Sequence, residues 1–369
     1  MPATIDADTH IDETFETWEH MLPSEQQFKP TVAYPSNPDP NRPLTRYWMI
    51  DGERQPWKTR YDHLTRTTVE GRELLDVTVR LHDMDLRNVE THVIYPTMFL
   101  TQPTANPEID LALKRSYNRW LAQKCVESGG RLRWMCLPPV MTMPEAIEEM
   151  RWAKDHGAVG IYKKGNDEAG RILTDPYFDP LWKEANDLDF AVCFHTGSGI
   201  PNLRSNRGAT NIGTTRVPFA SIPDAFNSLI LNKLPQQFPK VRWGFIEADA
   251  GWLPYELYRV ERRLNHPGEG ERSERLLTWD DLPAGFSIQH DAMKEFNLFV
   301  TCLVDEDLPY ILRFAGEDNI VVGSDYCHAD HSSEPDFQEV LWGRVKDEEM
   351  TSSSVTKMLY DNPKQLYGL

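Results

Sequence analysis

The chain has 369 residues, with 39 Lys and Arg against 57 Asp and Glu, which gives a formal net charge of -18. A surface this negative repels nucleic acid and anionic membranes, so we expect neither as a partner. No apolar run approaches the ~18 residues of a transmembrane helix, and no signal-peptide pattern follows the first methionine. Five cysteines without a C-x-x-C pair are typical of reduced, buried thiols. We therefore expect a soluble, cytoplasmic protein.

The first candidate strand ends at His10. A polar, proline-rich segment follows over about 20–70, and Asp51-Gly52 between two aromatic-bearing runs is typical of a β-hairpin turn. We interpret 20–70 as an insertion that forms either a lid over a site or a subunit interface.

Beyond this segment, helical and strand patterns alternate. Asn106-Pro107 predicts one helix start, and Thr142-x-x-Glu145 predicts another through a capping box. Further helices are expected over about 72–88, 177–188, 222–235 and 306–315, and from about 253. With the first strand, eight strands are expected, the others lying at 92–96, 132–137, 159–163, 190–195, 241–247, 297–302 and 320–323.

Eight mostly continuous apolar strands that alternate with helices predict a (β/α)8 TIM barrel, formed as a single domain by residues 1–369. A doubly wound parallel sheet is the alternative fold. In a barrel, the active site lies at the carboxyl ends of the strands.

Metal-binding side chains recur at these strand ends. Asp8 and His10 are two residues apart in a strand, so both point to the same side and can hold one metal ion. Later strands end in Lys163 and Lys164, His195, Glu247 and Asp325. Each has an ordinary explanation as a cap or loop residue when taken alone. Several at one rim of a barrel indicate a divalent-cation site.

At this point the sequence resembles the amidohydrolase superfamily, in the branch that includes aminocarboxymuconate semialdehyde decarboxylase and gamma-resorcylate decarboxylase. The motifs that carry the resemblance are Ile5-Asp6-Ala7-Asp8-Thr9-His10, Tyr117-Asn118-x-Trp120-Leu121, Phe194-His195-Thr196-Gly197, Gly251-Trp252-Leu253-Pro254-Tyr255 and Gly323-Ser324-Asp325-Tyr326. The resemblance implies a barrel with a catalytic metal bound by Asp8, His10, His195 and Asp325.

Two departures from that family pattern concern the metal. Many relatives open with H-x-H or E-x-H where this chain has Asp8-x-His10, and strand six commonly ends in His where this chain has Glu247. Hard oxygen ligands favour manganese or iron over zinc. One or two ions fit this set, and with two ions Glu247 or a carbamylated Lys164 would bridge them, as in some superfamily members. Only one of Lys163 and Lys164 can point into the barrel.

We assign expected roles to the remaining residues. Asp325 would carry a proton, and His195 would bind metal through one nitrogen while a second group orients the other. His328 is either an acid or extra ligand, or a surface histidine near His331. Arg204, Arg207 and Arg216 are candidate substrate-binding residues that would clamp a carboxylate, or else they are solvated loop cations. Trp252 is either a wall of the substrate pocket or a core residue.

Three functions follow. The first is metal-dependent hydrolysis or nonoxidative decarboxylation of a small carboxylic or aromatic acid. The second is a dinuclear iron or manganese-iron hydroxylase, favoured by Asp8 and Glu247. The third is a metal-binding, noncatalytic subunit of a complex. The expected partners are a small-molecule acid substrate and either further copies of the chain or a paralogous barrel.

Overall fold

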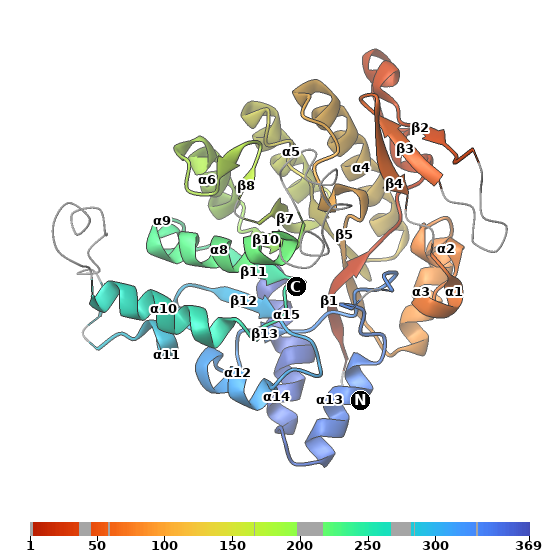
Figure 1. Cartoon of the computed structure of the whole chain (residues 1–369). Helices are drawn as coiled ribbons and strands as arrows, with labels where there is room; N and C mark the ends of the chain where they lie inside the picture. The colour runs from red at the N-terminus through yellow and green to blue at the C-terminus, as the bar shows by residue number, and fades with distance from the viewer. Residues whose placement is uncertain are drawn as a thin grey trace.

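The computed structural model describes residues 3–36, 46–57, 60–165, 167–197, 217–266, 282–283, 285–329 and 331–369. Its centre is one sheet of eight strands, each hydrogen-bonded in parallel to the next (Figure 1). In sheet order these are β1 (Ile5–His10), β5 (Thr91–Tyr95), β6 (Leu132–Cys136), β7 (Ala158–Lys164), β10 (Ala191–His195), β11 (Arg242–Ile246), β12 (Leu298–Thr301) and β13 (Ile320–Val321). Because both faces of a barrel strand are covered, most residues of these strands are buried.

The sheet closes at a seam between β1 and the segment that follows β13. The amide of Ala7 donates to the carbonyl of Val322, and the amide of Asp325 donates to the carbonyl of Asp8. Thr9 and Tyr326 form an isolated parallel bridge. The predicted (β/α)8 barrel is confirmed, and all eight predicted strands are its barrel strands.

Helices surround the strands (Figure 1). The longer ones are α3 (Val77–Leu86), α4 (Pro107–Glu127), α5 (Met143–Asp155), α6 (Asp179–Asp187), α8 (Val217–Leu231), α10 (Leu253–Asn265), α11 (Ile288–Glu295), α12 (Leu308–Ala315) and α13 (Phe337–Lys346). Shorter ones are α1 (Asp62–Thr65), α2 (Val69–Arg72), α9 (Leu234–Gln237), α14 (Ser352–Thr356) and α15 (Asn362–Tyr367). Across the described residues, no helix is both long and apolar enough to cross a membrane.

Two helix starts test the capping predictions. Asn106 caps α4 by accepting from the amide of Glu108, as predicted. The capping box at Thr142 is wrong, because its hydroxyl donates to the carbonyl of Pro139 instead of accepting from the helix. The helix predicted over 72–88 is confined to α3, and the helix predicted over 222–235 begins earlier, at Val217.

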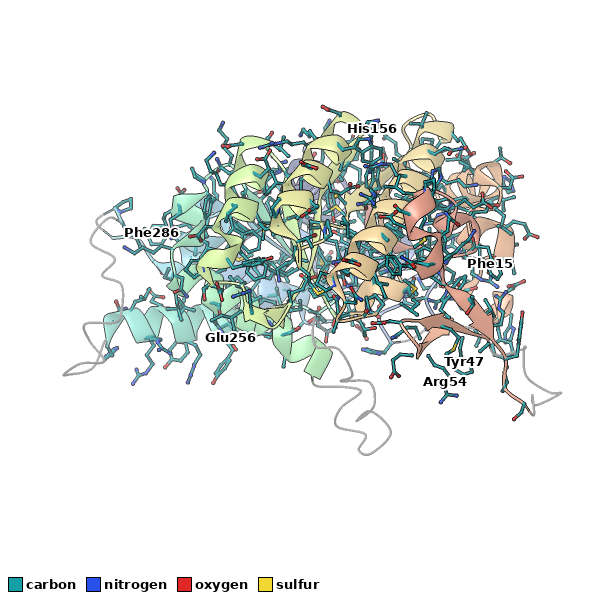
Figure 2. The ribbon with its side chains drawn as sticks, turned by 90° about the horizontal axis from the view of Figure 1, so that it is seen from above. Phe15, Tyr47, Arg54, His156, Glu256 and Phe286 are labelled. Carbon is teal, nitrogen blue, oxygen red and sulfur yellow. The ribbon has the colours of Figure 1, made fainter. Side chains whose placement is uncertain are left out.

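The insertion contains a three-stranded antiparallel sheet of β2 (Thr31–Ala33), β3 (Arg46–Ile50) and β4 (Glu53–Trp57). The hairpin predicted at Asp51-Gly52 is confirmed, since β3 and β4 pair around it. Figure 2 shows Tyr47 and Arg54 of this sheet on the side of the molecule opposite His156. Because His156 lies just before β7 begins, the small sheet lies at the carboxyl end of the barrel strands.

Ion pairs and hydrogen bonds fasten the insertion to the barrel. The guanidinium Nε of Arg60 lies 3.0 Å from both carboxylate oxygens of Asp12, just beyond β1. Gln55 donates to the carbonyl of Pro103 at 2.9 Å. These contacts place the insertion against the rim, and its role as a lid or interface stays a prediction.

The C-terminal helix α15 fastens the barrel from the other end. The hydroxyl of Tyr367 donates to the carbonyl of Ala7 at 2.6 Å and lies 2.9 Å from the hydroxyl of Tyr95. The main chain of this helix also accepts a hydrogen bond, at the carbonyl of Leu366, from Arg242 at the start of β11. The last helix therefore ties together three strands of the barrel.

Candidate metal centre

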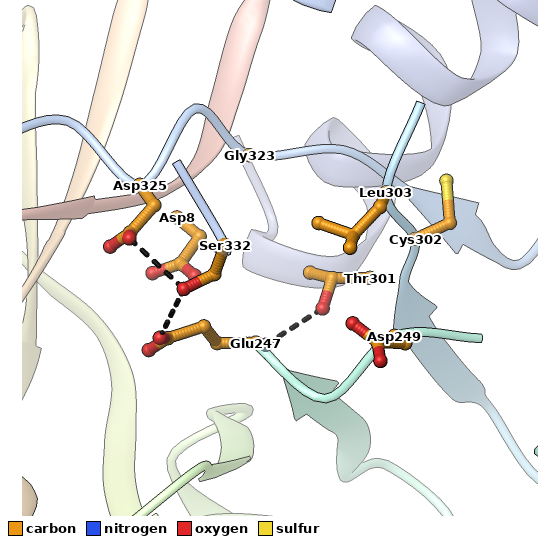
Figure 3. Close-up of a pocket in the computed structure, with 9 residues that line it drawn as sticks. All are labelled: Asp8, Glu247, Asp249, Thr301, Cys302, Leu303, Gly323, Asp325 and Ser332. Atoms are coloured by element: carbon orange, nitrogen blue, oxygen red, sulfur yellow. Dashed lines mark hydrogen bonds between the residues drawn. The ribbon is translucent and has the colours of Figure 1, made fainter. Parts of the chain in front are cut away.

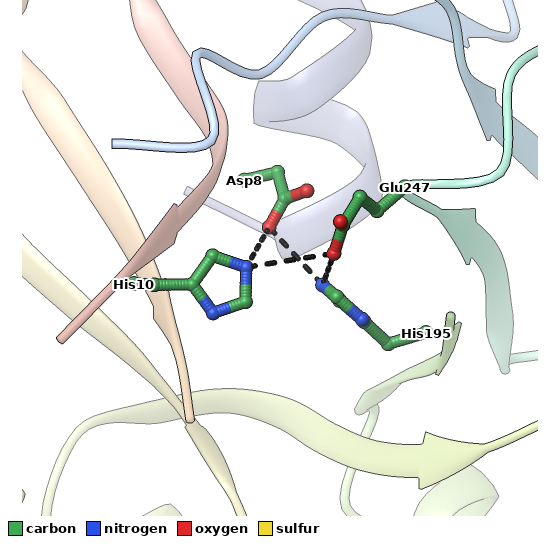
Figure 4. Close-up of side chains that lie close together, drawn as sticks. All are labelled: Asp8, His10, His195 and Glu247. Atoms are coloured by element: carbon green, nitrogen blue, oxygen red, sulfur yellow. Dashed lines mark ion pairs between the residues drawn. The ribbon is translucent and has the colours of Figure 1, made fainter. Parts of the chain in front are cut away.

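Imidazole and carboxylate side chains from three strands meet inside the barrel mouth (Figure 4). Asp8 and His10 come from β1, His195 from the end of β10, and Glu247 from the residue after β11. The Nε2 atoms of His10 and His195 each lie 3.4 Å from Oδ1 of Asp8. Oε2 of Glu247 lies 3.3 Å from Nε2 of His195 and 3.8 Å from Nε2 of His10. Four candidate ligand atoms thus surround one point.

The backbone fixes which nitrogen each of these histidines turns to the cluster. Nδ1 of His10 lies 2.9 Å from the carbonyl of Pro96, and Nδ1 of His195 lies 2.9 Å from the carbonyl of Thr196. A carbonyl oxygen only accepts, so each Nδ1 carries the proton and donates it. In the neutral ring, Nε2 then has a free lone pair aimed at the carboxylates, which is the form that binds a metal ion.

The donor set fits a divalent cation. Oδ1 of Asp8 and the Nε2 atoms of His10 and His195 are buried, and within the described part of the chain they have no hydrogen-bond partner. Buried polar atoms are nearly always partnered, because an unmet one costs about 1–3 kcal/mol. A cation between these atoms would remove that cost for all three together.

A second, overlapping group lies beside the first. His10 and Glu247 also belong to a set with Asp325 and His328, in which all the candidate ligand atoms lie within 4.8 Å of one another. Oδ1 of Asp325 is 3.3 Å from Nε2 of His10 and 2.6 Å from Nδ1 of His328. The His328 ring stacks on the His10 ring at a centroid distance of 4.0 Å, and its Nε2 lies 3.0 Å from the hydroxyl of Thr97.

The backbone is strained where two of the carboxylates leave the barrel. Glu247 and Asp325 have φ of 54° and 52°, in the left-handed region that residues other than glycine rarely adopt. The amide of Glu247 donates to the hydroxyl of Thr301, and the amide of Asp325 to the carbonyl of Asp8. Such strain costs about 1–3 kcal/mol and typically occurs at functional sites.

The carboxylate and the imidazoles shift each other's proton affinity. Burial raises the pKa of the Asp8 carboxyl, but His195 and His10 outweigh burial and hold that pKa well below its usual range. Burial lowers the pKa of His195, but the Asp8 and Glu247 carboxylates outweigh it and raise that pKa. For His10, burial prevails and the pKa is lowered. These shifts favour the ionised form of Asp8 and the neutral form of His10, which are the forms that bind a metal ion, whereas without a cation they favour the protonated form of His195.

Gly323 lets the segment that follows β13 pass close to Asp8. A Cβ atom at Gly323 would lie 2.3 Å from Cβ of Asp8 and 2.7 Å from its amide nitrogen. We expect Gly323→Ala to displace Asp8 and to weaken metal binding at least about tenfold, the effect typical of disturbed ligand support. Equilibrium titration of the metal-free protein with Mn²⁺ measures this. Gly343→Ala is the control, because nothing lies within 4 Å of a Cβ there, and equal affinities in the two variants would contradict the prediction.

The structure places both predicted lysines in a separate buried network. In the paired register Lys164 lies beside His195, and its Nζ is 3.2 Å from Oε1 of Glu168 and from Oε1 of Gln102. Nζ of Lys163 is 3.1 Å from Oε2 of Glu168. Lys164 is thus the lysine that faces the barrel interior, but its amine contacts Glu168, which is in neither candidate ligand group. Its role as a metal ligand stays a prediction.

The buried carboxylate of Glu168 makes the free energy of unfolding depend on pH. Burial raises the pKa of Glu168, but three nearby ammonium groups outweigh burial and lower it from 4.5 to about 2. Between these values the unfolded chain binds more protons than the folded chain, so this stabilisation is complete above pH 4.5 and is lost as the pH falls to about 2. We expect the stability difference between wild type and Glu168→Gln, measured by urea unfolding, to shrink over that range. A constant difference would contradict the prediction.

Three of the four predicted substrate-binding residues cannot be compared with the cluster. Arg204, Arg207 and Arg216 lie outside the described residues, so the carboxylate clamp stays a prediction. Trp252 packs edge-on against Phe226, with ring centroids 5.3 Å apart, and its indole donates to the carbonyl of Ala248. This is the placement of a core residue beside the site.

A pocket adjoins the cluster on the side of β11, β12 and β13 (Figure 3). Its lining consists of Asp8, Glu247, Asp249, Thr301, Cys302, Leu303, Gly323, Asp325 and Ser332.

Sequence reasoning missed two polar contacts of the site, Thr97 and Ser332. Neither has a spacing relation to a strand end, and only the folded chain brings them to His328 and Asp325.

The sequence profile of the amidohydrolase family matches residues 80–369. The chain belongs to the amidohydrolase family. This amidohydrolase is 22% identical over 270 residues to 2-amino-3-carboxymuconate-6-semialdehyde decarboxylase of Dictyostelium discoideum, over 68% of the chain and 66% of that relative. It is 29% identical over 132 residues to gamma-resorcylate decarboxylase of Rhodococcus jostii, over 33% of the chain and 40% of that relative. Both alignments span less than two thirds of the relative's length.

A solved structure agrees over the whole amidohydrolase fold. Dihydroxybenzoic acid decarboxylase from Polaromonas, with bound manganese and an inhibitor, superposes with a TM-score of 0.66 at 18% identity, covering 100% of the chain and 98% of the other. The family resemblance read from the sequence motifs is confirmed, including its decarboxylase branch.

Proposed function

We propose that this amidohydrolase-family protein is a metal-dependent carboxy-lyase that decarboxylates a small aromatic carboxylic acid without oxidation. The observation that carries the proposal is the buried cluster in which Asp8, His10 and His195 turn to one point atoms that lack a hydrogen-bond partner among the described residues. The two curated decarboxylase relatives support the choice of decarboxylation over hydrolysis.

The residues that would hold the cation are Asp8, His10, His195, Glu247 and Asp325. Their three carboxylates favour Mn²⁺ or Fe²⁺, and manganese is the metal in the Polaromonas structure. A divalent cation bound there supplies Lewis-acid chemistry by polarising a substrate oxygen. It would also offset the negative charge of the pocket, because four carboxylates line it and would otherwise repel an anionic acid.

The reaction breaks the bond between the ring carbon and the carboxyl carbon, releases CO₂, and puts a proton on the ring carbon. The proton comes from His328, whose Nδ1 lies 2.6 Å from Oδ1 of Asp325. The hydroxyl of Thr97 at Nε2 and the stacked ring of His10 hold His328 in place. A fixed donor at the reacting carbon is what general acid catalysis requires.

A CO₂-release assay tests the proposal. The purified protein, freed of metal and reloaded with Mn²⁺, Fe²⁺ or Zn²⁺, is incubated with a panel of hydroxybenzoic acids, including dihydroxybenzoates, the class named for the Polaromonas enzyme. We expect metal-dependent release of CO₂ with no uptake of dioxygen. Hydrolytic turnover without CO₂ would overturn decarboxylation, and dioxygen consumption with two metal equivalents per chain would favour the hydroxylase instead.

A further inference from the structure

Ser332 lies between two carboxylates of the metal centre (Figure 3). Its hydroxyl is 2.8 Å from Oε1 of Glu247 and 3.2 Å from Oδ2 of Asp325. The residue is 6% exposed and belongs to the loop after β13, whereas Glu247 follows β11. One hydroxyl therefore connects ligand candidates from two strands that are not neighbours in the sheet.

The oxygens that face Ser332 are not the ones that face the histidines. Glu247 turns Oε1 to Ser332 and Oε2 to Nε2 of His195, at 3.3 Å. Asp325 turns Oδ2 to Ser332 and Oδ1 to Nε2 of His10, also at 3.3 Å. In both carboxylates, one oxygen faces the hydroxyl and the other faces the cluster.

The contacts of the outer oxygens affect how the two carboxylates can bind a cation. A carboxylate turns easily about its last carbon–carbon bond, so nothing intrinsic decides whether it offers one oxygen or two to a cation. A hydroxyl that holds the outer oxygen removes that freedom, and an outer hydrogen bond of this kind commonly changes metal affinity 10- to 100-fold. The hydroxyl has one proton, which it donates mainly to Glu247, the closer acceptor.

We infer that Ser332 is a positioning residue of the metal centre, which holds Glu247 and Asp325 so that each presents one oxygen to the cation. The inference rests on the proposed metal-dependent function and names a residue that acts through its ligands. The contacts of Ser332 that carry the inference are those with the carboxylates of Glu247 and Asp325.

The test is the Mn²⁺ dissociation constant of the metal-free full-length protein, measured by calorimetry without substrate. The variants are Ser332→Ala, which removes the hydroxyl, and Ser332→Thr, which keeps it. The control is Ser354→Ala, because Ser354 is also a buried serine that donates to a carboxylate, that of Glu317, on the distant helix α14. Thermal unfolding of each metal-free variant shows whether it is folded.

We expect Ser332→Ala to bind Mn²⁺ about 10- to 100-fold more weakly, Ser332→Thr to recover most of the affinity, and Ser354→Ala to bind as wild type does. A folded Ser332→Ala protein with wild-type affinity would overturn the inference and leave the proposed function standing. If Ser332→Ala does not fold, wild-type affinity in a folded Ser332→Gly protein, which has no side chain to donate a hydrogen bond, would overturn it. A wild-type chain that binds no Mn²⁺, Fe²⁺ or Zn²⁺ would overturn both.

Discussion

Replacing His195 with alanine is expected to remove the bound metal and to lower kcat/KM for decarboxylation by about 10³-fold or more. The imidazole is fully buried, its Nε2 contacts both Asp8 and Glu247, and the carbonyl of Thr196 fixes its orientation. Alanine removes one nitrogen ligand and leaves the imidazole of His10 to face both carboxylates. Metal equivalents per chain, measured by elemental analysis after purification, report the loss independently of the substrate.

The matched control is His82→Ala. His82 is exposed on α3, and its removal should change neither metal content nor rate. Circular dichroism of both variants distinguishes loss of metal from loss of fold. An unchanged metal content in folded His195→Ala protein would remove this histidine from the ligand set.

Replacing Glu168 with glutamine is expected to lower the free energy of unfolding by about 3–5 kcal/mol, the usual cost of removing one partner from a buried ion pair. Its carboxylate lies 3.1 Å from Nζ of Lys163, 3.2 Å from Nζ of Lys164 and 3.8 Å from Nζ of Lys114. All four side chains are at most 3% exposed. Among the described residues, Glu168 contacts all three ammonium groups, whereas Asp110 lies 3.1 Å from Nζ of Lys114.

Glu184→Gln provides the comparison for this effect. Glu184 pairs with Arg151, whose side chain is 61% exposed, and pairs at the surface contribute about 0–1 kcal/mol. Urea unfolding at pH 7 measures both variants. A loss of less than 1 kcal/mol in Glu168→Gln would show that the lysines find other neutralisation, for example by giving up protons, which the pKa of Lys164, lowered by burial to about 8, makes inexpensive.

The barrel could be predicted because its strands are apolar runs with polar residues where they end. In any extended strand, residues two apart point to the same side, and the structure does place Asp8 and His10 on one side of β1. His195, Glu247 and Asp325 were found the same way. The motifs around them also carried the family resemblance, which the family profile confirms.

Other features depend on contacts that no local pattern encodes. Two adjacent lysines left open which one faced the interior, and the paired register with His195 decides for Lys164. The contact of that amine with Glu168 was not foreseen, because it depends on how the short hairpin of β8 (Asp167–Glu168) and β9 (Arg171–Ile172) folds back. The Thr142 capping box failed for a similar reason, since the carbonyl of Pro139 competes for the same hydroxyl.

The seam between β1 and the segment after β13 has a consequence for the order of assembly. Asp8 and Asp325 are held together there although the whole barrel separates them along the chain. During synthesis, nearly the entire polypeptide must therefore be made before Asp325 can reach Asp8 and His10, which are among the first residues of the chain. The tyrosine of α15 that binds the carbonyl of Ala7 is made later still. Contacts this distant in sequence form slowly. We therefore expect Asp8, His10 and Asp325 to come together only when the C-terminal part of the chain closes the barrel.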